Sequence, residues 1–335
     1  MRQEDERPED RLVPAGADQA LSPRRMDVAH RGLELARSLD GPDVAVGLQA
    51  RTVQFPSDRS MGDLHIWGSR PPTWQAFLEA RGTVTVPAGK KLWLDVSEQA
   101  CRDLSPLLAL KPDDLQMLRL SSAWLTDAQL AHLRGLTGLT WLGIQDSPIT
   151  DAGLSYIGDL TKLEHLDFSG TRITDSGLLH LHRLASLWDL ELGDLITDVG
   201  LAHLTGLTKL RWLDLGRTRI TDAGLAHLSR LNNLEWLTLN HTRTTDAGLA
   251  HLEGLTKLNM LWLAETGVTD AGLAHLEGLT NLEALDLTHT AITDVGLAHL
   301  RGLTNLGYIW LQGTQVTETG VAKLRATLPR CAIDP

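Results

Sequence analysis

Apolar residues recur along most of this chain in two alternating patterns. In residues 207–228, "LTKLRWLDLGRTRITDAGLAHL", Leu213 and Leu215 have the two-residue spacing of a strand with one buried face. The "GLAHL" segment spaces its leucines three residues apart after a Thr-Asp pair, which predicts a short helix. Thr221 is the expected N-cap of this helix, and Asp222 places negative charge where the helix dipole favours it.

This strand-and-helix unit repeats along the chain. Successive Thr-Asp segments are 24 residues apart, except for one step of 23 residues between Thr174 and Thr197. One unit cannot bury its leucines alone, so stacked units must share a core. We therefore predict an α/β solenoid with a parallel sheet on the concave side and short helices on the convex side. The segments begin at Thr126, Thr150, Thr174, Thr197, Thr221, Thr245, Thr269, Thr293 and Thr317.

The unit L-x-x-L-x-L-x-x-T-x-I-T-D-x-G-L-x-x-L-x-x-L resembles the leucine-rich-repeat family over residues 91–333. It is similar to the cysteine-containing repeats of F-box substrate receptors and to bacterial arrays of 24-residue repeats. The resemblance implies a right-handed horseshoe and a role mostly in protein recognition. Threonines stand where that family uses Asn or Cys to hydrogen-bond the turn backbone: Thr218, Thr242, Thr266, Thr290 and Thr314.

The ends of the array must be covered, because a bare layer of leucines would be insoluble. We expect residues 1–25 to be a disordered charged tail, residues 26–90 to be a β-rich cap, and residues 91–333 to be the solenoid. "KKLWLDVSEQACRDL" reads as a degenerate first repeat. In the cap, "RTVQF" and "DLHIW" predict a hairpin, "PTWQAFLEA" a short helix, and "TVTVPAG" a strand and turn. "VAKLRATLPRCAI" predicts a last helix, a proline stop and an apolar tail over the final layer.

Charge and cysteine content narrow the partners and the compartment. The 31 basic and 42 acidic residues give a net charge of −11, which disfavours nucleic acid. No apolar run is long enough to span a membrane, and "MRQEDERPED" does not resemble a secretory signal, so we expect a cytoplasmic protein without membrane contact. Cys101 and Cys331 lie near opposite ends of the array and are expected to be reduced.

Three columns of residues in the repeats invite a metal or phosphate site, and each has a simpler explanation. The histidines lie one per layer along the outer surface, so we expect a half-exposed ladder and not a metal array. A calcium site is the alternative for the aspartates, which the charge of a helix start already explains. The glycines lack the Lys-Ser/Thr of a phosphate loop and indicate close backbone packing. We expect no cofactor and no metal. The histidines are His132, His180, His203, His227, His251, His275 and His299.

The sequence contains no convincing arrangement for catalysis. There is no G-x-S-x-G elbow and no cysteine placed beside a histidine outside the repeats. An enzyme site in residues 26–95, around His30, Asp63 and His65, stays an alternative, but nothing marks these residues as a constellation. We therefore expect a protein that is not an enzyme.

The strongest functional pattern lies on the concave face. Strand positions on either side of the core leucines must point away from the core, and six of the ten tryptophans occupy them. An exposed aromatic stripe rimmed by charge is typical of a recognition site. Packing of the indoles along the sheet is the simpler explanation. The candidate ligand-binding residues are Trp93, Trp141, His165, Asp167, Asp189, Glu191, Trp212, Asp214, Trp236, Trp262, Asp286, Tyr308 and Trp310.

The sequence therefore predicts an intracellular module that binds a protein or peptide, and the acids beside the indoles favour a basic ligand. The alternative is a structural scaffold that binds through its convex face or its cap. The 23-residue step should distort the loop at Gly193 and leave the strand pairing intact, because one turn residue is missing there.

Overall fold

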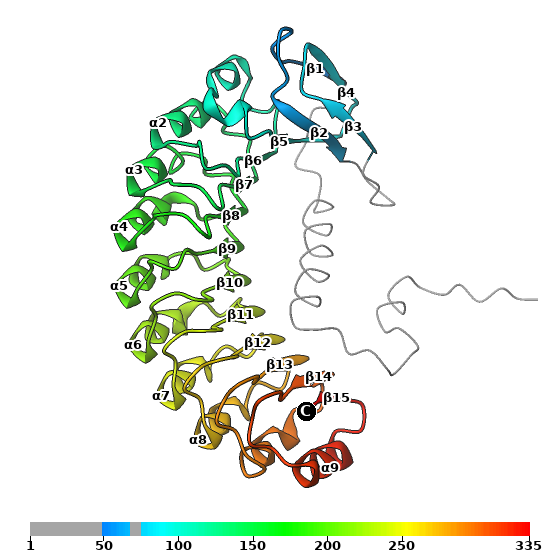
Figure 1. Ribbon diagram of the computed structural model, residues 1–335, viewed down its shortest axis with the longest axis vertical. Helices are drawn as coiled ribbons and strands as arrows, with labels where there is room; N and C mark the ends of the chain where they lie inside the picture. Colours follow the sequence, from blue (N-terminus) through cyan, green and yellow to red (C-terminus); the bar gives the residue numbers. More distant parts are fainter. Residues whose placement is uncertain (1–48, 68–74) are drawn as a thin grey trace, which may run out of the picture.

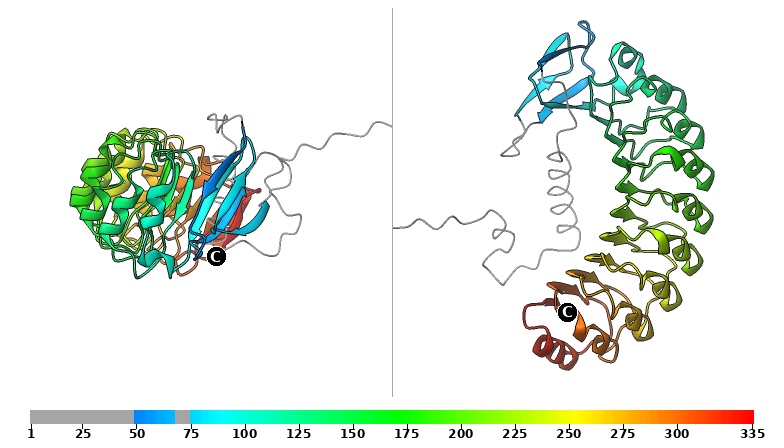
Figure 2. Two further views of the ribbon diagram at one scale, coloured as in Figure 1. Left: turned by 90° about the horizontal axis from the view of Figure 1, so that it is seen from above. Right: turned by 180° about the vertical axis from the view of Figure 1, so that it is seen from behind.

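The computed structural model describes residues 49–67 and 75–335. Strands line the inner side of an arc and short helices line its outer side (Figure 1). Thirteen strands form one sheet in the order β15-β14-β13-β12-β11-β10-β9-β8-β7-β6-β5-β2-β3, and β1 and β4 form a separate pair. Seen from behind, the same curved layers run from the cap to the C-terminal helix (Figure 2). The predicted solenoid, with its concave parallel sheet, convex helices and β-rich cap, is confirmed.

The strands are short and evenly spaced. They are β1 (Arg51–Gln54), β2 (Gly62–Trp67), β3 (Gln75–Glu79), β4 (Thr83–Val86), β5 (Lys91–Val96), β6 (Met117–Arg119), β7 (Trp141–Gly143), β8 (His165–Asp167), β9 (Asp189–Glu191), β10 (Trp212–Asp214), β11 (Trp236–Thr238), β12 (Met260–Trp262), β13 (Ala284–Asp286), β14 (Tyr308–Trp310) and β15 (Ala332–Asp334).

Helices α2 to α8 of the convex side are single turns of four residues, and most of them continue as 3-10 helix, whereas α9 has ten residues. The α-helices are α2 (Asp127–Leu130), α3 (Asp151–Leu154), α4 (Asp175–Leu178), α5 (Asp198–Leu201), α6 (Asp222–Leu225), α7 (Asp246–Leu249), α8 (Asp270–Leu273) and α9 (Glu318–Thr327). The 3-10 helices are η2 (Ala100–Arg102), η3 (Ser105–Ala109), η4 (Ala131–Leu133), η5 (Leu179–Arg183), η6 (Ala202–Leu204), η7 (Ala226–Arg230), η8 (Ala250–Leu252), η9 (Ala274–Leu276) and η10 (Gly296–Gly302).

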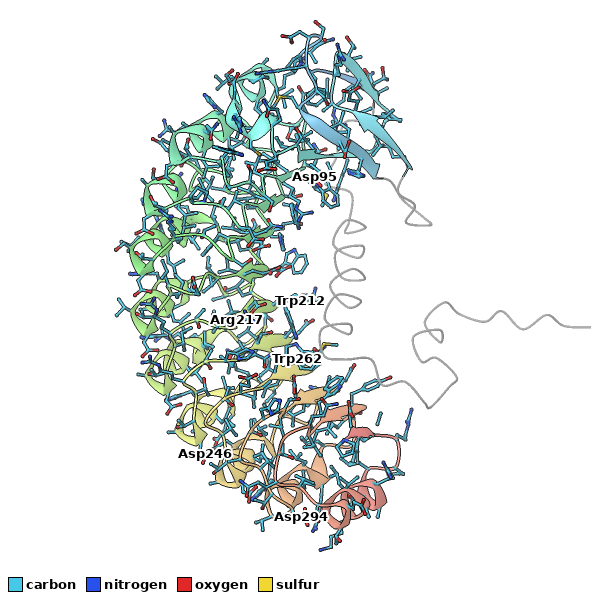
Figure 3. All side chains as sticks on the ribbon, in the orientation of Figure 1. Asp95, Trp212, Arg217, Asp246, Trp262 and Asp294 are labelled. Carbon is cyan, nitrogen blue, oxygen red and sulfur yellow. The ribbon has the colours of Figure 1, made fainter. Side chains whose placement is uncertain are left out.

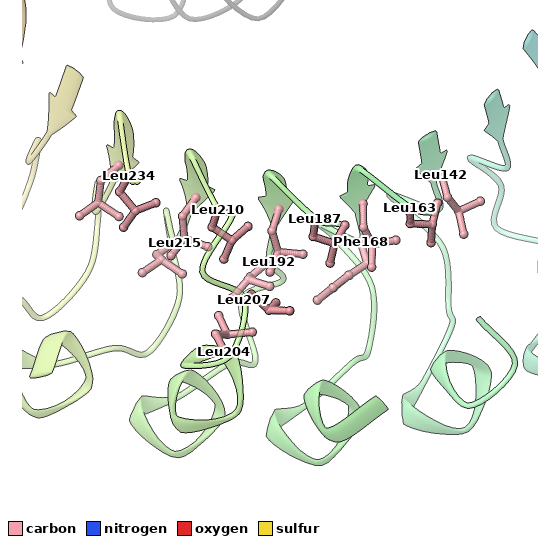
Figure 4. Close-up of a cluster of buried hydrophobic side chains, with 14 of the residues drawn as sticks. Leu142, Leu163, Phe168, Leu187, Leu192, Leu204, Leu207, Leu210, Leu215 and Leu234 are labelled. Carbon is pink, nitrogen blue, oxygen red and sulfur yellow. The ribbon is translucent and has the colours of Figure 1, made fainter. Parts of the chain in front are cut away.

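The core is one continuous column of leucines between the sheet and the helices (Figure 4). Leu213 at the middle of β10 and Leu215 just after it are completely buried. Leu225 and Leu228 of the convex side are also completely buried, so the two spacings in the sequence face each other across the core. Each repeat therefore buries its apolar residues against its neighbours, as a stack of repeats requires.

The aspartates at the helix starts join successive repeats. Asp222 accepts a hydrogen bond from the backbone N–H of Thr245 at 2.7 Å and another from its hydroxyl at 2.6 Å. Thr221 donates to Asp198 in the same way, at 2.8 and 2.7 Å. The predicted N-cap and acidic first turn are confirmed at Thr221 and Asp222. Helix-start charge is nevertheless an incomplete explanation for this column, because each carboxylate also holds the threonine of the next repeat.

Eight such pairs form a ladder along the convex side. They are Asp127–Thr150, Asp151–Thr174, Asp175–Thr197, Asp198–Thr221, Asp222–Thr245, Asp246–Thr269, Asp270–Thr293 and Asp294–Thr317. The hydrogen bonds from Thr317 lower the pKa of Asp294. A charge-assisted hydrogen bond of this kind is stronger than one between neutral groups, so the ladder fixes the spacing between layers.

The glycine that recurs in the repeats is part of the same ladder between repeats. A Cβ on Gly248 would lie 2.4 Å from Asp222 Oδ1, so only glycine leaves room for the carboxylate of the preceding repeat. This confirms the close packing expected from the glycine column. The repeat that contains Thr126 has Gln129 where later repeats have this glycine. The Oε1 of Gln129 accepts a hydrogen bond from the Thr126 N–H at 2.7 Å. Gln129 thus supplies, within its own repeat, the acceptor that later repeats receive from the preceding aspartate.

The 23-residue step changes one loop and leaves the sheet intact. Most loops that follow a strand place one residue at positive φ, such as Arg217 at 64°, whereas the loop after β9 has no such residue. The hydrogen bond from a turn threonine to the strand end, 2.6 Å from Thr218 to Leu215 in the next repeat, has no counterpart there because that loop lacks the threonine. Strand β9 still pairs in register with β8 and β10. The predicted local distortion with intact pairing is confirmed.

The structure of the cap corrects two predictions. The expected hairpin between the first two strands is wrong, because both edges of β2 are occupied by β3 and β5, and β1 pairs with β4 instead. The expected helix in "PTWQAFLEA" is wrong as well, because Gln75–Glu79 forms strand β3. Pairing with β2 outweighs the local pattern there. The disordered tail predicted for residues 1–25 lies outside the described residues.

The C-terminus closes the sheet with an additional strand. Helix α9 is present as expected, and Pro329 follows it. The apolar tail then forms β15, parallel to β14, with a 2.7 Å hydrogen bond from the Leu311 N–H to the Asp334 carbonyl. The longest helix in the described part of the chain has ten residues, which is about half of what a membrane span needs.

Candidate functional site

The concave face carries two columns of side chains, one on each side of the core leucines. In β10 the first column holds Trp212 and the second holds Asp214, with the buried Leu213 between them. The register aligns Trp212 with Asp189 of β9 and with Trp236 of β11. All thirteen candidate residues lie in strands β5 to β14, so the sheet brings them onto one face. Trp212 and Trp262 are seen on the inner side of the arc in Figure 3.

The tryptophans of this face are buried, which corrects the prediction of an exposed stripe. Trp212, Trp236, Trp262 and Trp310 are each 2% exposed. Their rings contact one another across the strands, with centroids 5.2 Å apart for Trp212 and Trp236 and 5.3 Å apart for Trp262 and Trp310. Strands about 4.8 Å apart bring large side chains of one column into contact. The alternative of packed indoles therefore describes the geometry better.

These rings belong to an apolar cluster that is separate from the leucine core. Met260 and Ala284 complete it, and Trp188 and Tyr308 pack against its margins. We call this set, together with the four buried tryptophans, the aromatic cluster. The indole N–H groups of Trp262 and Trp310 are buried and have no hydrogen-bond partner. Because the rings pack against one another in this cluster, removing any of them should also remove packing contacts.

A second aromatic group lies nearer the cap. His65 of β2 lies 5.3 Å from Trp93, and Trp93 lies 5.6 Å from Trp141. Trp141 stacks flat on His165, with centroids 4.7 Å apart and planes inclined by 1°. Trp93 and Trp141 are half-buried. No pattern in the sequence places His65 in this group, because its contact depends on the antiparallel pairing of β2 with β5.

His165 is surrounded by carboxylates. Its Nδ1 lies 2.6 Å from Asp189 Oδ2, and its side chain is almost completely buried. Burial opposes protonation of the ring, but Asp189, Glu191 and Asp167 together outweigh it and raise the pKa of His165. Asp167 accepts hydrogen bonds from the N–H and hydroxyl of Ser169, at 2.9 and 2.7 Å.

The second column places acids side by side across three strands. Asp167 aligns with Glu191, and Glu191 aligns with Asp214. We call these three residues the acidic row. Asp286 lies further along the same column and is buried, and this burial raises its pKa despite hydrogen bonds from Thr288.

A cavity of about 310 Å³ adjoins the acidic row and the aromatic cluster. Glu191 and Asp214 form one side, and Thr238 and Trp262 form another. Arg217 and other residues of the loops that follow the strands complete its wall. The cavity therefore lies where the two predicted kinds of ligand contact, acidic and aromatic, meet.

Trp188 and Arg211 are not among the residues that the sequence pattern selected. Each of them lies directly before the first-column residue of its strand. The Trp188 ring meets Trp212 edge to face at 6.2 Å, and the backbone N–H of Trp188 donates to the Glu164 carbonyl at 2.9 Å. Arg211 forms a bidentate pair with Glu235, at 2.9 and 2.6 Å. The signal that could have found them is the run of charged or aromatic residues at this strand position in consecutive repeats.

The other candidate sites remain apart from this face. The histidine ladder lies on the convex side, where His275 and His299 contact glutamates of the preceding repeats at 2.6 Å. In the region considered for an enzyme site, His30 lies outside the described residues and His65 packs on Trp93. Asp63 and Asp95 are paired in register across β2 and β5.

Comparisons with known proteins agree with this geometry. A family pattern described as "Leucine Rich repeat" matches residues 159–181, 206–229 and 278–300. The structure is similar to an internalin, InlF, from Listeria monocytogenes str. 4b F2365, with 25% identity, a TM-score of 0.57, and coverage of 69% of this chain and 70% of that chain. The fold and the repeats are those of a leucine-rich-repeat solenoid, a class of protein that binds other proteins, and the chain is similar to that family.

Two further structures are less similar. Internalin C2 from the same strain has 28% identity and a TM-score of 0.49, covering 62% of this chain and 83% of that chain. The ectodomain of the Arabidopsis receptor kinase HAESA, in complex with an extended IDA peptide hormone, has 17% identity and a TM-score of 0.43, covering 60% of this chain and 38% of that chain. Both likenesses are too weak to inform the function of this chain. No curated protein matches the sequence.

Proposed function

We propose that this protein binds an extended, basic segment of a partner protein on its concave face, over strands β8 to β12. The observation that carries the proposal is the acidic row, Asp167, Glu191 and Asp214, aligned across three adjacent strands. The row concentrates negative charge on one part of the concave face, and concentrated negative charge attracts a cationic ligand. Leucine-rich-repeat and other solenoid proteins use their concave surfaces for binding.

The aromatic cluster also contributes to this binding surface, but not as a row of exposed rings on which a ligand could stack. Trp212 and Trp236 are too deeply buried to offer open ring faces. They provide an apolar floor beside the acidic row, against which the aliphatic part of an arginine or lysine side chain can pack. The cavity beside Trp262 gives such a side chain a place to enter.

The protein acts by binding and not by catalysis, and the acidic row disfavours phosphate-rich ligands such as nucleic acid. Cys101 and Cys331 are buried free thiols, and burial raises their pKa values to about 11 and about 12. Unpaired thiols at both ends of the array support a cytoplasmic setting.

The test selects ligands from a displayed library of random peptides, with the full-chain protein as bait at low salt. We expect the selected peptides to be enriched in arginine and lysine. The affinity of one selected peptide is then measured for wild type, for Asp214→Asn and for Glu277→Gln, at low and at high salt. Asp214→Asn keeps the Oδ1 that accepts from the Gly216 N–H, so its fold should be preserved.

We expect Asp214→Asn to weaken binding about fivefold or more, which corresponds to about 1 kcal/mol. Salt should weaken binding by wild type, because part of the attraction is a screened charge interaction. Glu277→Gln removes one negative charge from the exposed convex side and should change little. Selection of neutral or acidic peptides, or equal affinity of both variants, would place the site elsewhere.

Trp212→Ala is not a clean test of binding. The sequence pattern assigned this residue to the surface, but an indole that is 2% exposed contributes packing. Truncating a buried aromatic side chain costs about 3–5 kcal/mol, so this variant should also lower the melting temperature.

A further inference from the structure

One group of side chains on the concave face has the composition of a metal site. Within the described residues, His165, Asp189 and Glu191 each offer one ligand atom, and these atoms all lie within 4.8 Å of one another. The residues come from β8 and β9, where His165 is aligned with Asp189 and Glu191 lies two positions further on the same face. This group is distinct from the convex histidine column, whose members lie one per layer.

The imidazole is held in a fixed orientation. Trp141 stacks flat on one face of the His165 ring, and Asp189 holds Nδ1 at 2.6 Å. The other nitrogen, Nε2, is buried without a hydrogen-bond partner. Nε2 points away from Asp189, so an ion shared with that carboxylate would bind Nδ1 and take the place of the proton between Nδ1 and Oδ2, while Nε2 would keep the ring's remaining proton.

The distances are close to those of a coordinated ion. Ligand atoms about 2.0–2.2 Å from one ion lie roughly 3–4 Å apart, so the three side chains need only small rotations to converge. Glu191 is half-buried and forms part of the wall of the 310 Å³ cavity, which provides a route from solvent. A carboxylate has several lone pairs, so Glu191 can bind an ion and keep another contact.

The donor set selects the kind of ion. One imidazole nitrogen with two carboxylate oxygens suits zinc and neighbouring divalent ions, whereas calcium prefers six to eight oxygen ligands. Three protein ligands also leave at least one coordination position open. We propose that His165, Asp189 and Glu191 bind one divalent transition-metal ion, with zinc as the representative.

The test titrates metal-free, full-chain protein with Zn²⁺ by calorimetry, in the absence of any peptide. We expect one ion per chain. His165→Ala should abolish this binding, and Glu191→Gln should weaken it by more than the roughly 10- to 100-fold that loss of an orienting partner costs. His251→Ala is the matched control, because this histidine is exposed on the convex side and should not affect binding.

A second readout guards against a variant that merely unfolds. Co²⁺ bound at this site should quench tryptophan fluorescence in wild type, because Trp141 lies against the His165 ring. The quenching should persist in His251→Ala and be lost in Glu191→Gln, whose fold is checked by its melting temperature.

Weak binding of several ions, equal in wild type, His165→Ala and Glu191→Gln, would overturn the proposal and indicate adsorption to the histidine ladder. The result is independent of peptide affinity, so it can fail while the proposed function stands, and the reverse also holds. If both hold, bound Zn²⁺ should weaken binding of the basic peptide, because the ion neutralises part of the charge next to the acidic row.

Discussion

Folding shifts the pKa of individual carboxylates in this protein in opposite directions. Asp286 is 2% exposed, and its burial raises its pKa. Asp294 lies at the surface, and two hydrogen bonds from Thr317 lower its pKa. The same residue type therefore opposes folding at one position and favours it at another, depending on whether desolvation or hydrogen bonding is larger.

These two residues should show opposite pH dependence. The folded pKa of Asp286 lies above its unfolded value, so its ionisation destabilises the fold as pH rises from about 4. We expect Asp286→Asn to raise the melting temperature near neutral pH, and this gain should vanish near pH 3. The amide keeps an oxygen that can accept from Thr288.

The folded pKa of Asp294 lies below its unfolded value, so its contribution is present above about pH 4 and is lost as pH falls. Asp294→Asn should therefore lower the melting temperature near neutral pH and match wild type in acid. Melting curves of both variants and wild type between about pH 3 and pH 7 check both signs. Parallel shifts at every pH would contradict this account.

At the level of elements, the Thr-Asp-x-Gly segment works between repeats and not within one helix. Asp222 holds Thr245 of the next repeat, and Gly248 leaves space for the Asp222 carboxylate. Helices α2 to α8 are single turns, too short to be stable alone. Their position therefore depends on this ladder and on the leucines beneath it.

Gly248→Ala tests the ladder against a control in the same repeat. The added Cβ would lie 2.4 Å from Asp222 Oδ1, and we expect a loss of about 1–3 kcal/mol in the free energy of unfolding. Gly254→Ala places its Cβ where nothing lies within 4 Å, so it should be neutral or slightly stabilising.

Chemical denaturation measures both free energies, and a double variant locates the cause. Asp222→Ala removes the atom that Gly248→Ala would contact, so the double variant should lose less than the sum of the two single losses. Full additivity would show that the glycine is required for another reason.

At the level of the whole molecule, the continuous sheet leaves two ends to be closed. Strands β2 and β3 extend it antiparallel at the cap, and β15 extends it parallel at the other end. Ile309 of β14 and Leu311 just after it are at most 2% exposed. An open edge and an open leucine layer would coincide there if β15 were missing.

Removal of residues 329–335 should therefore cause self-association and lower the melting temperature. The truncation exposes the β14 edge and removes the 2.7 Å bond from the Leu311 N–H to the Asp334 carbonyl. Asp334→Ala keeps this backbone bond and serves as the control. Light scattering after size-exclusion chromatography distinguishes the two. A truncated protein that stays monomeric, with an unchanged melting temperature, would show that α9 alone closes the array.

The sequence by itself determined the repeating strand and helix, the leucine core, the parallel concave sheet and the altered loop at Gly193. These follow from spacing, because the position of Leu213 or Leu225 relative to its neighbours in the chain decides which face it occupies. The constant period also placed the thirteen candidate residues in two columns on one face. For the same reason, the period alone aligns Asp167 with Glu191.

Only the tertiary structure decided how deeply those side chains are buried and which of them touch. The burial of Trp212, the stacking of Trp141 on His165 and the approach of Asp189 depend on the shapes of side chains in adjacent strands. The pairing of β2 with β5, rather than with β1, depends on competition for strand edges. A periodic pattern specifies direction, whereas burial and contact arise from the packing of residues that are far apart in the chain.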